Sequence, residues 1–171
     1  AYKSVTAPSN MRTMIAAIVP QCGVGNSMAM LIPENASDAS YPRWAALLLA
    51  TLSSMAFDFV LRQKVQGQNL NWFIVEQAAV ITPARFNARL PAVFASAMRG
   101  AKLMNGSHPR PTVADFVLPQ VLALTYTAHD MAPFARDMGF VDAQGDVLPP
   151  MVWDEDERRA RMAALDAVFF Y

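Results

Sequence analysis

The sequence predicts a mixed α/β fold of the α+β class, in which a small sheet packs on a central helix and a helical C-terminal subdomain follows. Apolar and β-branched residues over 11–19 are typical of a strand, residues 43–63 have dense apolar content at helical spacing, and amphipathic helical stretches follow residue 86. The chain has 171 residues, 54% of them hydrophobic and 16% charged. This composition suits one compact domain or two small ones and excludes a disordered tail.

The first predicted strand covers residues 11–19, where both faces are largely apolar and Pro20 ends the run. Gly23 and Gly25 indicate a turn, and residues 27–32 are predicted as a return strand that stops at Pro33. The two strands would then form a hairpin or a loop-linked pair. A surface loop rich in Asn, Ser, Asp and Ala is expected over residues 34–42.

The central helix is predicted over residues 43–63, because Leu48, Leu52, Met55 and Phe59 recur at helical spacing. One or two further strands are predicted after it, over residues 70–74 and at Val80 and Ile81, before Pro83.

The second part of the chain is predicted to be helical. Residues 86–103 form an Ala-rich amphipathic stretch, and the Asn-Gly-Ser sequence at 105–107 is the clearest internal break. This break divides the chain into an α/β subdomain (1–104) and a helical subdomain (105–171). Thr112 and Asp115 resemble a helix-start box, and Pro119 predicts either a kinked helix or two shorter ones.

The last two helices are predicted from their end signals. A helix over 127–138 would end at Gly139, a plausible C-cap, and Asp154 with Glu157 would open a final helix that runs to Tyr171. Since the chain stops on an apolar helix face, we expect it to be a piece cut from a longer protein.

The charge balance is uneven along a chain whose formal net charge is zero. Residues 1–100 carry eight Lys and Arg against four acids, a balance of +4, and the remainder carries −4. This asymmetry indicates that the first part would face a polyanion. The single Cys22 excludes an internal disulfide, and no signal peptide or membrane span is recognisable, so we expect a cytoplasmic protein with no membrane partner.

No catalytic motif is present: the sequence has no P-loop, dinucleotide fingerprint, Gly-x-Ser-x-Gly elbow or paired-His metal site. We therefore predict no catalytic and no metal-binding residues. His129 beside Asp130 is one possible acid/base pair, but adjacent helical residues do not face each other, which favours an ordinary helix-end His. Cys22 has no identifiable His partner and is interpreted as unreactive.

Residues 62–71, which read RQKVQGQNLN, have the most unusual composition in the chain. Arg and Lys contact phosphates, while Arg, Gln and Asn have the geometry for paired hydrogen bonds to base edges in the major groove. A solvated helix end is the ordinary alternative, because cations are favourable near helix C-terminal carbonyls. The predicted DNA-contacting residues are Arg62, Lys64, Gln66, Gln68, Asn69 and Asn71, with Arg12 and Lys3 as auxiliary phosphate contacts.

Three stretches, residues 2–33, residues 47–83 and residues 124–140 with 149–171, resemble the C-terminal region of bacterial type II (type IIG-like) restriction–modification methyltransferases. The most specific elements are the Arg12-Thr13 strand running to Pro20, the LLLATLSS helix and the segment from Asn71 to Pro83. Ala78 and Ala79 depart from the family pattern, which commonly has Leu-Pro here. The family's last helix also usually continues beyond the position of Tyr171.

The resemblance implies a target recognition domain that binds double-stranded DNA for an adenine-specific DNA methyltransferase. In that family an N-terminal methyltransferase domain binds S-adenosylmethionine and carries an Asn-Pro-Pro-aromatic motif. This chain has no such motif: its Pro149-Pro150 lies between Leu148 and Met151. No PD-(D/E)xK nuclease motif is recognisable either. We therefore expect a non-catalytic C-terminal fragment with no cofactor of its own, whose partners are duplex DNA and the methyltransferase domain.

Two other hypotheses remain at this point. The domain could be a scaffold that packs on the methyltransferase domain without contacting DNA, which the neutral pI of about 7.0 favours. It could also be a small independent enzyme that uses His129 and Asp130. An exposed apolar patch without a basic groove would favour the scaffold.

Overall fold

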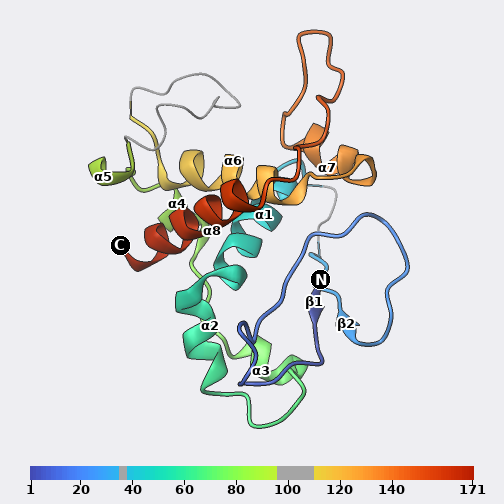
Figure 1. Cartoon of the computed structure of the whole chain (residues 1–171), viewed down its shortest axis with the longest axis vertical. Helices are drawn as coiled ribbons and strands as arrows, with labels where there is room; N and C mark the ends of the chain where they lie inside the picture. The colour runs from blue at the N-terminus through green and yellow to red at the C-terminus, as the bar shows by residue number, and fades with distance from the viewer. Residues whose placement is uncertain (35–37, 96–109) are drawn as a thin grey trace.

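The computed structural model describes residues 1–34, 38–95 and 110–171. Helix α6 packs against both α1 and α8, and Figure 1 shows α2 leading away from α1 toward the N-terminal segment and its short strands. Helices dominate and the sheet has two short strands, so the predicted α+β class is confirmed. Two hydrophobic clusters form the core, one centred on α6 and one where the N-terminal segment meets α2.

The predicted central helix is two helices, α1 (Tyr41–Ser53) and α2 (Met55–Arg62), whose axes differ by 59°. Ser54 breaks the helix because its backbone is extended (φ −71°, ψ 148°). Its hydroxyl donates to the Thr51 carbonyl (2.8 Å) and accepts from the Phe57 amide (3.2 Å), so it both ends α1 and caps α2. Apolar spacing continues across the break, which is why the sequence resembles one helix.

Within the described residues, no single helix has the length and apolar composition needed to cross a bilayer. Only α1 and α2 taken together reach that length and composition, and they are bent at Ser54.

The small sheet consists of β1 (Tyr2–Lys3) and β2 (Met28–Ala29), paired antiparallel with Tyr2 opposite Ala29. On the other side of β1, the Lys3 amide donates to the Ile15 carbonyl (2.9 Å), and Tyr2 forms an isolated bridge with Ala16. The prediction that residues 11–19 and 27–32 pair directly is therefore wrong, because residues 2–3 lie between them. Residues 11–19 are extended without forming a regular strand.

The sheet packs on the central helices, as predicted. Tyr2 and Met14 are each 2% exposed and belong to the second cluster, which is completed by residues of α1, α2 and the segment that follows them. These further members are Leu52, Phe57, Leu61, Val65, Leu70 and Ile74.

The strand predicted over residues 70–74 is also wrong, because this segment forms the short helix α3 (Trp72–Glu76). Leu70 and Ile74 are buried, whereas Trp72 and Phe73 are exposed. A strand would have placed residues 70, 72 and 74 on one face, so the exposure of Trp72 between two buried residues does not fit a strand. The aromatic residues explain the error, since they are also typical of strands. Val80 and Ile81 form no strand.

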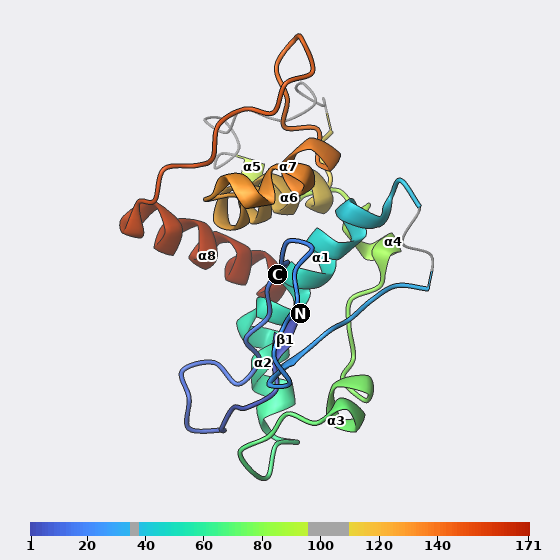
Figure 2. The ribbon, with the colours of Figure 1, turned by 90° about the vertical axis from the view of Figure 1, so that its right-hand side faces the viewer.

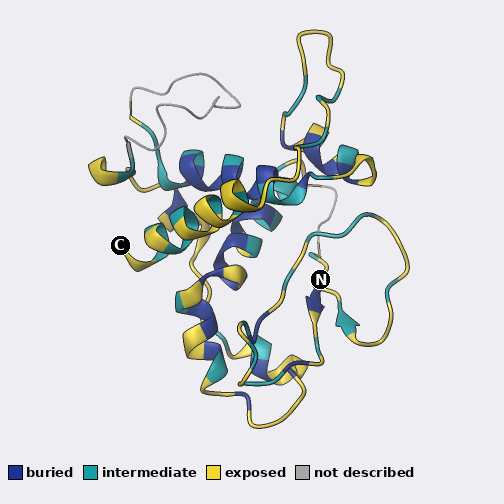
Figure 3. Ribbon diagram, in the orientation of Figure 1, coloured by how far each residue is buried: buried dark blue, intermediate teal, exposed yellow. Residues whose placement is uncertain are grey.

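The larger cluster is centred on α6 (Val113–Thr125), eight of whose residues are buried (Figure 3). The predicted helix start is confirmed: the Thr112 hydroxyl accepts from the Asp115 amide, and the Asp115 carboxylate accepts from the Thr112 amide (2.8 Å). Pro119 lies inside one unsplit helix. Packing of α6 in the core offsets the missing hydrogen bond, which typically costs about 3 kcal/mol.

The prediction of a helix over residues 86–103 is wrong for residues 86–95, the part that the structure describes. Two short helices, α4 (Pro83–Phe86) and α5 (Ala92–Ala95), flank an extended stretch. In this stretch the Leu90 amide donates to the Pro111 carbonyl (2.9 Å), and Arg89 forms an isolated antiparallel β-bridge with Thr112. The break predicted at 105–107 and the subdomain boundary lie outside the described residues. The larger cluster combines side chains from both sides of that boundary, including those of α1 and α6.

The C-terminal part is helical, as predicted. A 3-10 turn, η2 (His129–Met131), leads into α7 (Ala132–Asp137), and Gly139 follows with φ +77°, a conformation that favours glycine. The loop after α7 projects from the body (Figure 2). The final helix α8 (Glu155–Phe170) is capped by Asp154, as predicted, because the Asp154 carboxylate accepts from the Glu157 amide (2.8 Å). It packs on α6 and α2.

A buried carboxylate on α2 fixes the extended segment before β2. Asp58 is 4% exposed, and its Oδ1 accepts hydrogen bonds from the amides of Thr13 (2.7 Å) and Met14 (2.8 Å). Its Oδ2 accepts from Arg62 (2.8 Å), which also donates to the carbonyls of Pro8 (2.9 Å) and Met11 (3.0 Å). The backbone of residues 8–14 is therefore held by two side chains one helical turn apart, since Asp58 accepts from its amides and Arg62 donates to its carbonyls. We call this arrangement the Asp58–Arg62 clamp.

Replacing Asp58 with Ala should lower the free energy of unfolding by about 3 kcal/mol or more, since it leaves two buried amides and a partly buried guanidinium without their acceptor. Urea denaturation measures the change. The matched control is Asp156→Ala on α8, whose side chain is 96% exposed and whose loss should change stability little. Equal effects of the two substitutions would contradict the structural role of the clamp.

Candidate nucleic-acid interface

The predicted DNA-contacting loop follows α2 and is anchored at both sides by buried apolar residues. Val65 is 5% exposed and Leu70 is fully buried. Between them the backbone pairs with the N-terminal segment: the Thr6 amide donates to the Gln68 carbonyl (2.9 Å), and the Leu70 amide donates to the Ser4 carbonyl (2.7 Å). The backbone of the loop is therefore held, while its polar side chains are left to the solvent.

A continuous path of hydrogen bonds connects this loop to α2. The Thr13 amide binds Asp58, the Thr13 carbonyl accepts from the Thr6 hydroxyl (2.8 Å), and the Thr6 amide binds the Gln68 carbonyl. Thr6 and Thr13 are 3% and 0% exposed, so water does not compete for these bonds. The position of residues 66–71 thus depends on the Asp58–Arg62 clamp.

Six of the eight predicted contact residues present their side chains to solvent on this part of the molecule: Lys3, Lys64, Gln66, Gln68, Asn69 and Asn71. Lys64 Nζ contacts the Gln77 carbonyl at 3.4 Å. The four amide side chains form no hydrogen bond with any described residue. Asn71 is the N-cap residue of α3, but its side chain makes no capping hydrogen bond. Lys3 comes near the loop through β1, because Ser4 binds Leu70. The structure therefore brings these six residues into one region.

The two arginines have a different environment. Arg62 uses its guanidinium for the clamp, and its side chain is 31% exposed. Arg12 donates to Asp166 Oδ2 of α8 (2.9 Å) and is 32% exposed, while Asp166 Oδ1 accepts from the Met55 amide (2.7 Å). Both arginines stabilise the fold, so the exposed polar groups of the surface come from the other six residues, of which Lys64 also donates to the Gln77 carbonyl.

The charges near the loop have both signs. Lys3 and Lys64 are exposed cations, and Glu76 on α3 is an exposed anion. Burial raises the pKa of the Tyr2 phenol above its ordinary value, so Tyr2 adds no charge beside Lys3.

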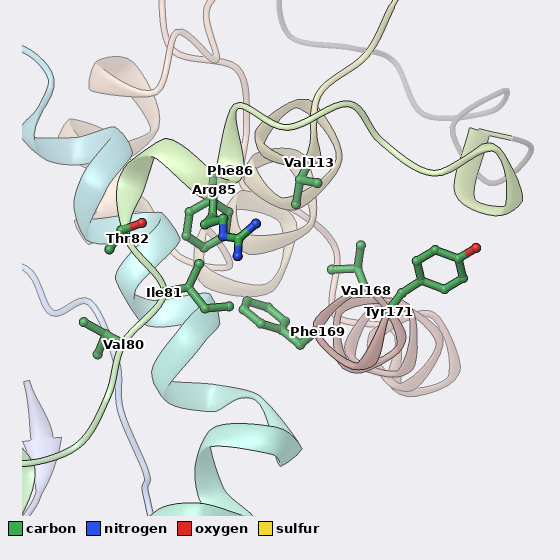
Figure 4. A pocket seen from close by; sticks show the side chains of 9 residues that line it. All are labelled: Val80, Ile81, Thr82, Arg85, Phe86, Val113, Val168, Phe169 and Tyr171. Atoms are coloured by element: carbon green, nitrogen blue, oxygen red, sulfur yellow. The ribbon is translucent and has the colours of Figure 1, made fainter.

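A separate pocket of about 410 Å³ lies between residues 80–86, the start of α6 and the end of α8 (Figure 4). Its walls are mainly apolar, and the Phe86 and Phe169 rings meet edge to face with centroids 6.2 Å apart. Among the described residues, Arg85 is the one charged side chain that lines it, and no predicted site residue does. The described residues that line it are Val80, Ile81, Thr82, Arg85, Phe86, Val113, Val168, Phe169 and Tyr171.

The other candidate chemical residues do not form a site in the described parts of the chain. His129 and Asp130 are exposed neighbours in η2 that share no hydrogen bond and do not line the pocket. Cys22 is exposed and unpaired. No group of three or more His, Cys, Asp or Glu side chains that could hold a metal ion occurs among the described residues. His108 lies outside them.

Sequence reasoning missed the residues that position the loop, namely Asp58, Thr6 and Thr13. One signal was available for Asp58, because an acid and an arginine four residues apart on a helix commonly pair. Nothing in the sequence indicates that Thr6 and Thr13 meet, since their contact depends on the path of an irregular segment.

Comparison with known proteins gives no further information: no protein-family model, curated protein or solved structure matches this chain.

Replacing Thr6 with Val removes the hydroxyl that joins the Thr13 carbonyl to the loop while keeping the side-chain shape. We expect the free energy of unfolding to fall by about 1–2 kcal/mol, because a buried carbonyl loses its donor. Trypsin should also cleave faster after Lys64. Urea denaturation and timed proteolysis measure both effects, with the exposed Ser9→Ala as the control. Unchanged stability and cleavage would show that this bond does not hold the loop.

Proposed function

We propose that this chain is the DNA sequence-recognition region of a bacterial restriction–modification adenine-specific DNA methyltransferase. In this proposal it contributes no catalytic residue. It positions double-stranded DNA for methylation by a separate catalytic domain, which binds S-adenosylmethionine. The sequence resemblance supplies the class of enzyme, and the loop after α2 supplies the contact surface.

The observation that carries the proposal is a loop whose backbone is hydrogen-bonded to the N-terminal segment and whose polar side chains are exposed. Gln66, Gln68, Asn69 and Asn71 have amide groups that can donate to and accept from base edges. The fixed backbone lowers the entropy lost when such groups are ordered by a ligand. Lys3 and Lys64 add the positive charge that phosphate groups require.

The division of roles among the cations refines the prediction. Arg12 and Arg62 are engaged in ion pairs with Asp166 and Asp58, which stabilise the segments that carry the surface. Lys3 and Lys64 are the cations exposed for phosphate contact. With a formal net charge of zero for the chain, affinity must come from local contacts rather than from overall attraction.

The double substitution Lys3→Ala/Lys64→Ala should weaken binding to a mixed-sequence DNA duplex. If each lysine contacts one phosphate, the slope of log K against log salt should fall in magnitude by about 2. Fluorescence anisotropy with a labelled duplex at several salt concentrations measures this slope.

The control is Arg159→Ala on α8, which also removes an exposed cation and should leave the slope unchanged. An equal slope for the double variant and the wild type would exclude the two lysines from the interface. Absence of salt-dependent duplex binding by the wild-type protein would contradict the proposed function itself.

A second candidate function, a scaffold that packs on the catalytic domain without touching DNA, is favoured by apolar side chains on α2. Met55, Phe59 and Val60 are 51%, 68% and 51% exposed. Exposed apolar residues gathered on one element are typical of protein contact surfaces. On this alternative, Phe59→Asp would abolish binding to the methyltransferase domain, while Lys3→Ala/Lys64→Ala would leave DNA affinity unchanged.

A further inference from the structure

Two adjacent aromatic side chains project into solvent directly after the polar loop. Trp72 is 59% exposed and Phe73 is 58% exposed, although both belong to α3. Single exposed apolar residues are common in proteins, but two neighbouring aromatic rings on a five-residue helix present a substantial uncovered surface.

The rings are held in place by the residues on either side of them. Leu70 (0% exposed) and Ile74 (9% exposed) insert into the second hydrophobic cluster. The Ile74 amide donates to the Asn71 carbonyl (3.0 Å), and Lys64 contacts the Gln77 carbonyl just beyond α3. Trp72 and Phe73 are therefore exposed on an anchored segment, so their exposure follows from the fold.

The surroundings of the rings indicate which kind of partner covers them. Exposed amide side chains precede the rings in the chain at Asn69 and Asn71, and Lys64 reaches the Gln77 carbonyl just beyond α3, so polar groups and a cation flank this helix. Flat aromatic faces beside amide groups and a lysine match the chemistry of a nucleic acid, in which bases offer π-faces and edges and the backbone offers phosphates. Glu76, one turn from Trp72, is the one acidic group of α3 and opposes a phosphate there.

We propose that the rings of Trp72 and Phe73, which leave α3 in different directions, are each a stacking surface for a base that leaves the helical stack of the bound DNA. This inference rests on the proposed function and specifies how the loop engages its ligand. The amide side chains contact base edges, the lysines contact phosphates, and each ring covers the face of an unstacked base. Such a contact requires a base displaced from the duplex or inserted at a kinked step.

The test uses two probes that do not require knowledge of the target sequence: a single-stranded oligothymidine, whose bases are already free, and a fully paired mixed-sequence duplex. Stacking quenches tryptophan emission, so oligothymidine should quench the wild-type protein and a Trp153→Phe variant alike. The Trp72→Phe variant should lose most of this quenching. Trp153 is a matched control because it is 62% exposed but lies next to α8, over Arg158.

Affinity gives the second readout. Trp72→Ala/Phe73→Ala should raise the Kd for oligothymidine about tenfold or more, whereas Trp153→Ala should leave it unchanged. Glu76→Gln should lower the Kd, since it removes the one negative charge of α3. Circular dichroism confirms that each variant is folded. Because Leu70 and Ile74 remain, loss of the exposed rings should not unfold the protein.

The outcomes separate this inference from the proposed function. Salt-dependent duplex binding with no effect of Trp72→Ala/Phe73→Ala on either probe overturns the stacking surface alone. If the same variant instead abolishes association with the methyltransferase domain while DNA affinity is unchanged, the rings are a protein contact and the stacking proposal is wrong. If the wild-type protein binds neither probe, both proposals fail.

Discussion

The carboxylate of Asp58 organises the half of the molecule that carries the candidate interface. Residues 8–14 have little regular secondary structure, so their amides and carbonyls find partners in the side chains of α2. Two amides and a guanidinium donate to this buried carboxylate and offset its lost hydration, whereas the same group without those donors would be strongly destabilising. The irregular segment and the helix therefore depend on each other.

The consequences of the clamp extend to both the loop and α8. Through Thr13 and Thr6, the hydrogen bonds continue to Gln68, so the loop after α2 is held from the same point. Arg12, in the clamped segment, binds Asp166 of α8, and Asp166 also accepts from the amide at the start of α2. Two cations predicted to contact DNA thus stabilise the surface, and the more exposed cations beside the loop are Lys3 and Lys64.

The parts of the fold with local signals could be predicted from the sequence. The cap of α6 at Thr112, the start of α8 at Asp154 and the glycine after α7 each depend on neighbouring residues. The predictions were wrong where distant contacts decide the structure. Residues 2–3 lie between the two predicted strands, and the aromatic segment after Leu70 forms the helix α3, from which Ile74 inserts into the second hydrophobic cluster. For the candidate site, composition identified the exposed loop. It could not show which of its cations are engaged within the fold, because that depends on Asp58 and Asp166.

The most direct test of the central claim is amide hydrogen exchange across the path from α2 to the loop. If the Asp58–Arg62 clamp holds the interface, the amides of Thr13 and Met14, which bind Asp58, should exchange slowly and together with those of Thr6 and Leu70. All four would then open in one cooperative unit. Rapid exchange at Thr6 and Leu70 while Thr13 and Met14 stay protected would show that the loop moves independently of the clamp. That result would contradict a pre-formed surface for DNA.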